Sequence, residues 1–502
     1  MMVKVFGCSL SGLDGLQVTV EVNVSRGAKF YMVGLPDNAI KESHQRISAA
    51  VKNIGMKIPI KEIIVNLAPA DIRKEGSAYD LTIAIGILTA TGLIPKNNII
   101  SDYLIMGELS LDGFLRPIKG VLSMAVLAKR KGYKGIVVPA ENSSEASLVD
   151  GIHVLPVNHL TDLISHILGK QKINPLKGKP CFNLTNSLLD FKDVKGQKSV
   201  KRALEIAAAG GHNILLIGPP GSGKSMLAKR VSSILPKLTS QEILETTQIY
   251  SISNMLEKNY VGIPPFRSPH HTISDVGMVG GGKIPKPGEI SLAHNGVLFL
   301  DEVPEFKRSV LEVLRQPLED KQVSISRALK SVVFPADLML VGAMNPSPSG
   351  GFYHPNNSNA NLKDVKKYLA KLSGPFLDRI DLQVEVNPVP IDQFSEVELN
   401  ESSNEIRKRV MDARRIQYSR SGQKNSNLNE YGLQKYCELS KESKKVLITA
   451  SKKMNISARS YTRIQKIART IADLDSSEKI ELNHLAEAIQ YRTLDKMNQF
   501  LN

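Results

Sequence analysis

The sequence predicts an α/β protein with three parts: an α+β N-terminal domain, an αβα core around a phosphate-binding loop, and a helical C-terminal region. Two observations predict the core. The apolar run 215–217 stops at a glycine-rich turn and continues as a helical pattern, and a second apolar run, 297–300, ends in two carboxylates. Short buried strands that alternate with helices are typical of a parallel sheet.

The composition limits the class of protein. With 502 residues the chain can hold about three domains. Its formal net charge of +16 favours a polyanionic partner, nucleic acid more than a membrane surface. Cys8, Cys181 and Cys437 lie far apart, so neither a disulfide framework nor a cysteine metal cage is expected. An export pattern at residues 1–10 and an apolar run of about 20 residues are both absent. We therefore expect a soluble, cytoplasmic protein without a membrane partner.

The N-terminal domain is expected at residues 1–168. Apolar and polar side chains alternate at 16–22, as in a half-exposed strand. Helices are expected at 41–55 and 121–131, and the stretch 73–81 is expected to open a long apolar helix that runs through Leu93. Strands are expected at 63–67 and 135–139.

This order, with the stretches 74–80 and 107–122, resembles the proteolytic domain of Lon-type proteases. Aligned in that way, the nucleophilic serine falls on Ala78 and the base lysine on Leu122; Ser77 is one place away and Lys119 three. Because nucleophile and base must lie within hydrogen-bond reach of each other, we expect no proteolysis. A structural or DNA-binding role remains for this domain.

A basic linker is expected at 169–190, with lysines and prolines and little periodicity. Such a segment joins domains and could also touch a phosphate backbone. The nucleotide-binding core is expected at 191–390 and a helical lid at 391–502. The lid prediction rests on apolar residues at helical spacing in 464–472 and 482–491, and a very basic helix is expected at 404–420.

The glycine-rich turn has the spacing of a phosphate loop, which predicts ATP and Mg²⁺ as cofactors. Its residues are Gly218, Pro219, Pro220, Gly221, Ser222, Gly223, Lys224 and Ser225. Lys224 would reach the β- and γ-phosphates and the Ser225 hydroxyl would bind Mg²⁺. After the second strand, Asp301 would hold Mg²⁺ through water and Glu302 would polarise the attacking water.

Two features lie between these motifs. His270 and His271 are adjacent, and adjacent side chains diverge, so we expect them to shape a loop and not to bind a metal. Lys283 and Lys286 follow a run of glycines. This loop is either a solvated surface loop or a mobile basic loop that grips a nucleic acid strand.

The stretch 288–302 is similar to the AAA+ branch that includes minichromosome maintenance helicases, enhancer-dependent activators and magnesium chelatase subunits. Together with 266–272, it resembles the magnesium-chelatase-like ComM/YifB family. The resemblance implies a homohexameric ATPase ring that drives branch migration of DNA in natural transformation, with single-stranded or branched DNA as its partner.

The same resemblance implies three further site residues. Asn345 would orient the attacking water as the first sensor, Arg379 would be the arginine finger that reaches the neighbouring subunit, and Arg459 would be the second sensor, with Arg463 in reserve. Many relatives carry a cysteine-rich segment after the first sensor. Serines replace those thiols here, and because hydroxyls are poor zinc ligands, no zinc site is predicted.

In residues 322–334, apolar and polar side chains alternate before Arg327 and after Lys330, which predicts a hairpin with a basic tip. In the helicases that this branch resembles, such a hairpin projects into the central pore; the alternative is an exposed hairpin with ordinary solubilising charges.

The leading hypothesis is an ATP-driven motor on DNA. A magnesium-chelatase-type ATPase subunit and a protein-remodelling chaperone remain alternatives.

Overall fold

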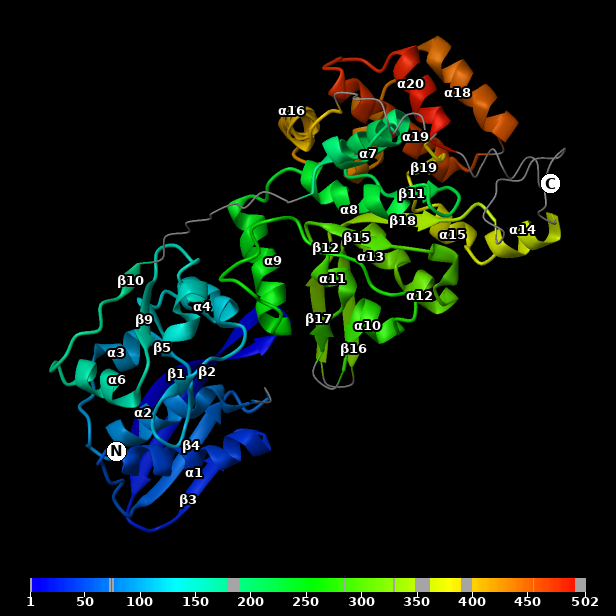
Figure 1. Cartoon of the computed structure of the whole chain (residues 1–502). Coiled ribbons are helices and arrows are strands. Elements are labelled where there is room, and N and C mark those ends of the chain that lie inside the picture. The colour runs from blue at the N-terminus through cyan, green and yellow to red at the C-terminus, as the bar shows by residue number, and fades with distance from the viewer. Residues whose placement is uncertain are drawn as a thin grey trace. The chain divides into compact units, whose positions relative to one another are not determined.

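The computed structural model describes residues 2–71, 74, 76–177, 189–282, 285–327, 330–347, 362–389, 400–454 and 456–492 (Figure 1). The chain forms two compact units. The N-terminal unit comprises Met1–Asn183 and Ser240–Val261, and the C-terminal unit comprises Leu184–Thr239 and Gly262–Asn502. The predicted fold class is confirmed: both units combine sheets with helices, and the C-terminal region is helical.

The N-terminal unit contains a mixed eight-stranded sheet in the order β10-β9-β8-β5-β1-β2-β4-β3. Its strands are β1 (Met2–Ser11), β2 (Asp14–Ser25), β3 (Phe30–Val33), β4 (Glu62–Ala68), β5 (Tyr103–Ile105), β8 (Gly135–Pro139), β9 (His153–Val157) and β10 (Leu176–Lys177). Most residues of β2 alternate between buried and more exposed positions, as predicted. Strand β3 pairs only with β4 and forms one edge of the sheet.

Helices α1 to α6 and a short two-stranded ladder lie between residues 38 and 167 of this unit. They are α1 (Asn38–Asn53), α2 (Asp80–Ala90), α3 (Asn98–Asp102), α4 (Val121–Arg130), α5 (Ser143–Ala146) and α6 (Leu160–Ile167), with β6 (Glu108–Leu109) paired to β7 (Leu115–Arg116) and single turns η1 (Ser77–Tyr79) and η2 (Ala140–Asn142). Every residue of α2 is buried. Its sequence is apolar on all sides for that reason.

Helix α9 (Ser240–Ser253) belongs to the N-terminal unit, although it follows the phosphate loop in the sequence. Ser251 of α9 accepts a hydrogen bond from the Gly120 amide, at 3.1 Å, and donates one to Glu145, at 2.5 Å. Glu145 also accepts from the Leu122 amide in the first turn of α4. Burial raises the pKa of the Glu145 carboxyl. Helix α9 is thus anchored to the start of α4 and to α5 of the same unit.

The C-terminal unit is built on five parallel strands in the order β12-β15-β18-β11-β19. The strands are β11 (Ile214–Ile217), β12 (Phe266–Arg267), β15 (Val297–Leu300), β18 (Met339–Met344) and β19 (Leu382–Glu385). The chain runs from the interior strand β11 to the edge at β12, returns through β15 and β18, and ends on the other side of β11. Ligands bind at the carboxyl ends of strands in sheets with such a switch in order.

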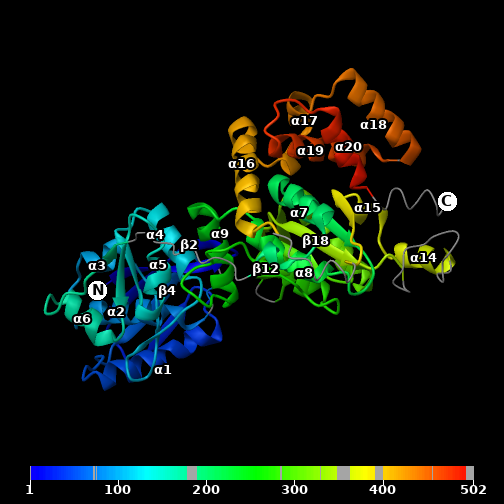
Figure 2. The ribbon, with the colours of Figure 1, turned by 45° about the horizontal axis from the view of Figure 1, so that its top comes forward.

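The other elements of this unit surround the sheet and form the lid. They are η3 (Phe191–Asp193), α7 (Lys198–Gly210), α8 (Lys224–Ile234), α10 (Asp275–Val279), β13 (Gly280–Gly281), β14 (Lys286–Pro287), α11 (Glu289–Leu292), η4 (Val303–Glu305), α12 (Arg308–Val313), α13 (Arg315–Asp320), α14 (Leu362–Leu369), α15 (Gly374–Leu377), α16 (Ser403–Ser421), η6 (Asn425–Asn427), α17 (Glu430–Tyr436), α18 (Lys441–Met454), α19 (Ala458–Leu474) and α20 (Leu482–Gln490). Helices α16 and α19 lie beside α7 in both views (Figures 1 and 2). The helices predicted in the lid are confirmed. No helix in the described part of the chain is long and apolar enough to cross a membrane.

The predicted hairpin is also confirmed. Strand β16 (Gln322–Arg327) pairs antiparallel with β17 (Lys330–Pro335), and its last pair joins Arg327 to Lys330. It forms a two-stranded sheet of its own and extends away from the parallel sheet (Figure 1).

Candidate active site in the C-terminal unit

The phosphate loop leaves the carboxyl end of β11 and leads into α8. Gly221 and Gly223 have φ angles of 77° and 90°, in the left-handed region that favours glycine. A Cβ atom on Gly218 would lie 2.2 Å from the Val386 carbonyl oxygen, so only glycine fits there. The first turn of α8 presents backbone N–H groups without intrahelical partners toward this loop, which is favourable for anions.

Lys224 is buried at the start of α8. Its ammonium group donates hydrogen bonds to the carbonyl oxygens of Gly218 and Pro219, at 2.7 and 2.8 Å, and to Asn345 Oδ1 at 3.2 Å. Burial lowers the pKa of Lys224, and the carboxylates of Asp301 and Glu302 oppose that shift. These contacts link the end of β11 to the end of β18.

The two carboxylates after β15 differ in their surroundings. Asp301 accepts a hydrogen bond from the Ser225 hydroxyl at 2.7 Å, so the two residues predicted to share Mg²⁺ are in direct contact. Glu302 is exposed, and its backbone has φ and ψ of 51°, a left-handed conformation that costs about 1 kcal/mol or more in a non-glycine residue. The Glu302 side chain lines the cavity beside Asn345.

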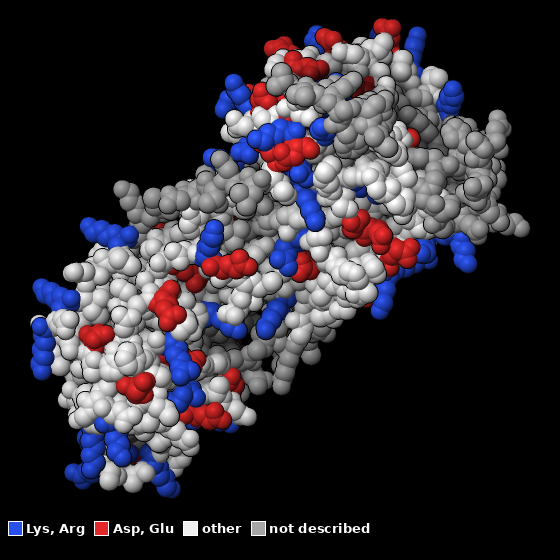
Figure 3. Space-filling model, in the orientation of Figure 1, with Lys and Arg blue, Asp and Glu red and all other residues white. Residues whose placement is uncertain are grey.

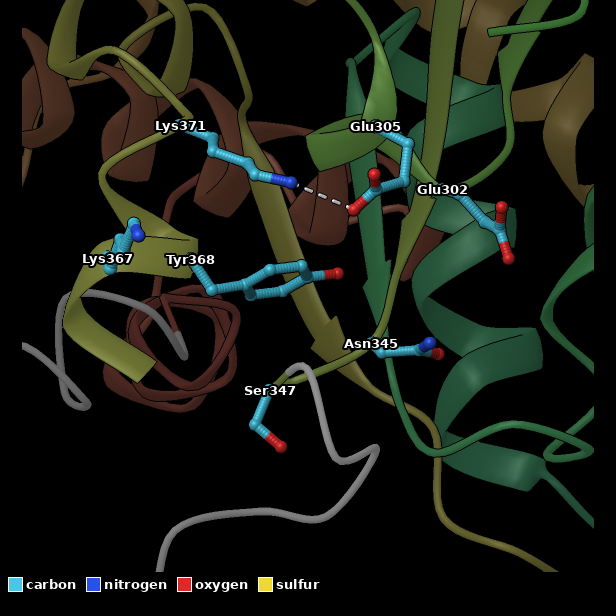
Figure 4. A pocket seen from close by; sticks show the side chains of 7 residues that line it. All are labelled: Glu302, Glu305, Asn345, Ser347, Lys367, Tyr368 and Lys371. Carbon is cyan, nitrogen blue, oxygen red and sulfur yellow. Dashed lines mark hydrogen bonds and ion pairs between the residues drawn. The ribbon is translucent and has the colours of Figure 1, made fainter. Parts of the chain in front are cut away.

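A cavity of about 570 Å³ opens beside Glu302 and Asn345 (Figure 4). Its other walls are Glu305, Ser347, Lys367, Tyr368 and Lys371. Burial raises the pKa of Tyr368 on α14 to about 12, and the Asn345 backbone opposes that shift. Lys371 forms an ion pair with Glu305 at 3.0 Å. Sequence reasoning missed the residues on α14 because they follow Asn345 by more than 20 positions and belong to no motif.

The residues around the loop fit a nucleotide with Mg²⁺. Ser222 Oγ is buried and has no hydrogen-bond partner within the described residues, so a donor or acceptor is available beside the loop. Lys224 supplies a cation, and Ser225 with Asp301 supplies the oxygen ligands that Mg²⁺ prefers.

Arg379 lies elsewhere. It precedes β19, at the amino end of the strands, whereas the phosphate loop leaves the carboxyl end of β11. The four residue pairs between β11 and β19 alone span roughly 10 Å. The Arg379 side chain is 7% exposed and donates to Glu319 at 2.5 Å and to the Pro375 carbonyl at 2.8 Å. It is therefore separated from the loop of its own chain.

The two arginines of α19 also differ. The side chain of Arg459 is 60% exposed and lies 4.0 Å from Asp378, next to Arg379 in the sequence. Arg463 is paired with Asp381, which is buried and also contacts His212. Arg463 therefore holds the lid to the core, while Arg459 remains accessible.

The remaining predicted residues are only partly described. Lys283 and residues 348–361, where the absence of a zinc site is predicted, lie outside the described residues; Lys286 is exposed on β14. The His270 and His271 rings pack on each other with centroids 4.1 Å apart, and His271 meets Phe306 edge-on.

The positions aligned with the Lon dyad lie in the N-terminal unit. Leu122 is fully buried and Lys119 is exposed to solvent. The Ser77 hydroxyl is hydrogen-bonded to Glu108. Among the described residues, no lysine contacts Ser77 through an ion pair or hydrogen bond.

Comparisons with known proteins match this arrangement. The family model described as magnesium chelatase, subunit ChlI, matches residues 190–394, with a related model at 20–142 and the C-terminal model of the same subunit at 400–492. The chain is 43% identical to the uncharacterized protein YifB of Escherichia coli over 97% of this chain and 96% of that one. It is 42% identical to competence protein ComM of Haemophilus influenzae over 99% of both. Lon protease 2 of Bacillus subtilis is 27% identical over 34% of this chain and 32% of its own, in the N-terminal region. The chain therefore belongs to the YifB/ComM family of magnesium-chelatase-like AAA+ proteins.

Proposed function

We propose that this protein is an ATP-driven motor that acts on DNA and works as a ring, with branch migration during transformation or recombination as its task. The observation that carries the proposal is the convergence of Lys224, Ser225, Asp301, Glu302 and Asn345 at one edge of the parallel sheet.

Each residue has a chemical task in this proposal. Lys224 binds the phosphates, and Ser225 and Asp301 hold Mg²⁺, which neutralises the charge on the β- and γ-phosphates. Glu302 faces the cavity and polarises the attacking water, while Asn345 orients that water. Tyr368 lines the same cavity as Glu302 and Asn345.

The position of Arg379 supports a ring. Because it lies at the amino end of the strands, it can serve only a nucleotide site on another copy of the chain. Arg459 lies at the same edge and is accessible, so we assign it to the same neighbouring site. Within one chain Arg379 forms an ion pair with Glu319. On assembly, Arg379 must release Glu319 and bind the phosphate of the neighbouring nucleotide instead.

DNA as the substrate is supported by the net charge of +16, by the hairpin β16–β17 with basic residues at its end, and by the similarity to competence protein ComM. The family descriptions favour a second candidate, the ATPase subunit of a magnesium chelatase. Hydrolysis rates with no DNA and with single-stranded, duplex and branched DNA separate the two. The motor requires stimulation by at least one of these, and a rate that none of them changes contradicts it.

A further inference from the structure

The N-terminal unit contains a second cavity, which the ATPase reaction does not use. It measures about 610 Å³ and lies between the C-terminal half of α1, the loop 54–61 and the start of β3. Four of its lining residues are lysines and none is acidic: Lys29, Lys52, Lys57 and Lys61. We call this the lysine groove.

All four ammonium groups are available to a ligand. Each lysine is exposed, and within the described part of the chain none of them has an ion pair. Lys41 adds a further positive charge on the same face of α1 as Lys52, because Lys41, His44, Ser48 and Lys52 are spaced three or four residues apart. Lysine and arginine side chains gather at the end of the unit that carries α1 and β3, at the lower left of Figure 3.

The interior of the groove is aromatic and apolar. The Phe30 and His44 rings are packed with centroids 4.0 Å apart and planes 33° apart, and both line the cavity. Burial lowers the pKa of His44, so its ring is neutral at pH 7. The Ile60 side chain is 82% exposed at the rim, while Met56 and Ile58 pack against the core beneath.

We propose that the lysine groove is a binding site for single-stranded nucleic acid, separate from any DNA contact of the ATPase ring. Proteins that hold single strands combine a basic track for phosphates with aromatic faces for bases. A duplex keeps its bases stacked inside and offers phosphates alone, so it can use the lysines but not the Phe30–His44 pair. The groove would give the Lon-like region a binding role in place of proteolysis.

The test uses the full chain without nucleotide and fluorescein-labelled oligothymidylate of about 20 nucleotides, a length that exceeds the site size of one small binding module. Binding is followed by fluorescence anisotropy at several salt concentrations. For Lys52→Ala, Lys57→Ala and Lys61→Ala combined, the slope of log K against log[salt] should fall by about 2, since each lost contact removes about 0.7. The matched control combines Lys119→Ala, Lys129→Ala and Lys131→Ala, three exposed lysines of the same unit, and should keep the slope.

A second variant tests the aromatic pair without changing charge. Phe30→Leu keeps an apolar side chain against the core and should weaken single-strand binding about fivefold or more, with an unchanged salt slope and unchanged duplex binding. Unaltered affinity and slope in both variants overturn the proposal. An equal loss for single strand and duplex in Phe30→Leu overturns the preference for single strands, and equal competition by polyglutamate overturns nucleic acid as the ligand. This proposal and the motor are tested separately. The groove variants can bind DNA normally, which refutes the groove, while DNA still stimulates hydrolysis. Conversely, DNA can leave the hydrolysis rate unchanged while the groove still binds single strands.

Discussion

At the scale of single residues, the contacts of Lys224 and Glu302 predict different defects. Lys224→Ala removes the cation beside the loop and should abolish binding of a fluorescent ATP analogue. Glu302→Gln keeps the shape of an exposed side chain and removes only the water-polarising charge, so the analogue should bind while hydrolysis falls by about 100-fold or more. Equilibrium binding and steady-state phosphate release measure the two effects. Normal turnover in the Glu302 variant would refute its assigned role.

A partly buried ion pair between core and lid, Asp337 with Lys424, predicts the pH dependence of stability. Burial alone would raise the pKa of Asp337, but Lys424 at 2.6 Å and Lys321 at 3.4 Å lower it to about 2. A depressed folded-state pKa adds stability above the unfolded value near 4, and that stability is lost as the pH falls toward 2. Asp337→Asn should therefore lower the free energy of unfolding by roughly 2 kcal/mol at pH 7.

Denaturant titrations of wild type and Asp337→Asn between pH 7 and pH 3 check this prediction. The difference between the two proteins should shrink as the pH falls below 4. Asp320→Asn is the matched control, because Asp320 is exposed and has no ion pair in the described structure, and it should shift stability little at any pH. A constant difference across the range would show that Asp337 acts by packing alone.

The residues of the nucleotide site show what sequence can and cannot predict. The contact between Ser225 and Asp301 followed from two motifs whose chemistry requires a shared Mg²⁺. Tyr368 and Lys371 could not be found in this way, because only the fold brings α14 to the wall of the cavity. The pairing of Arg379 with Glu319 could not be predicted from the sequence either, since 60 residues separate them.

At the scale of elements, the β16–β17 hairpin carries a prediction about DNA. Removing both basic residues at its end, in Arg327→Ala with Lys330→Ala, should lower the salt slope of DNA affinity by about 1.4 to 1.8, or 0.7 to 0.9 for each lost phosphate contact. Hydrolysis without DNA should be nearly unchanged, because the hairpin forms its own sheet outside the nucleotide site. Lys444→Ala with Lys445→Ala on α18 removes the same charge from an exposed helix and serves as the control. An unaltered slope would leave the hairpin as an ordinary exposed element.

The elements themselves were largely predictable because each has a local cause. Strand β8 matches its predicted range, and α16 matches its own to within one residue at each end. The location of α9 was not predictable. Its apolar residues indicate a helix, but periodicity does not say which unit that helix covers, and the decisive contacts are Ser251 with Glu145 and Gly120.

At the scale of the whole molecule, the parallel pairing of β11 and β19 leads to a test of whether Arg379 acts between subunits of a ring. Arg379→Ala should bind ATP yet lose hydrolysis by about 10³-fold, the usual effect of removing an arginine finger. Another copy of the chain can supply the arginine that this variant lacks. The reason is that Arg379 lies at the amino ends of the strands, opposite the phosphate loop of its own chain. Mixing Arg379→Ala with Glu302→Gln should therefore restore hydrolysis, since the second variant supplies the arginine and the first supplies the glutamate. A chain with both substitutions supplies neither and should restore nothing when mixed with Arg379→Ala. If the Glu302→Gln mixture is as inactive as that control at every ratio, Arg379 does not act between subunits and its bond to Glu319 is purely structural.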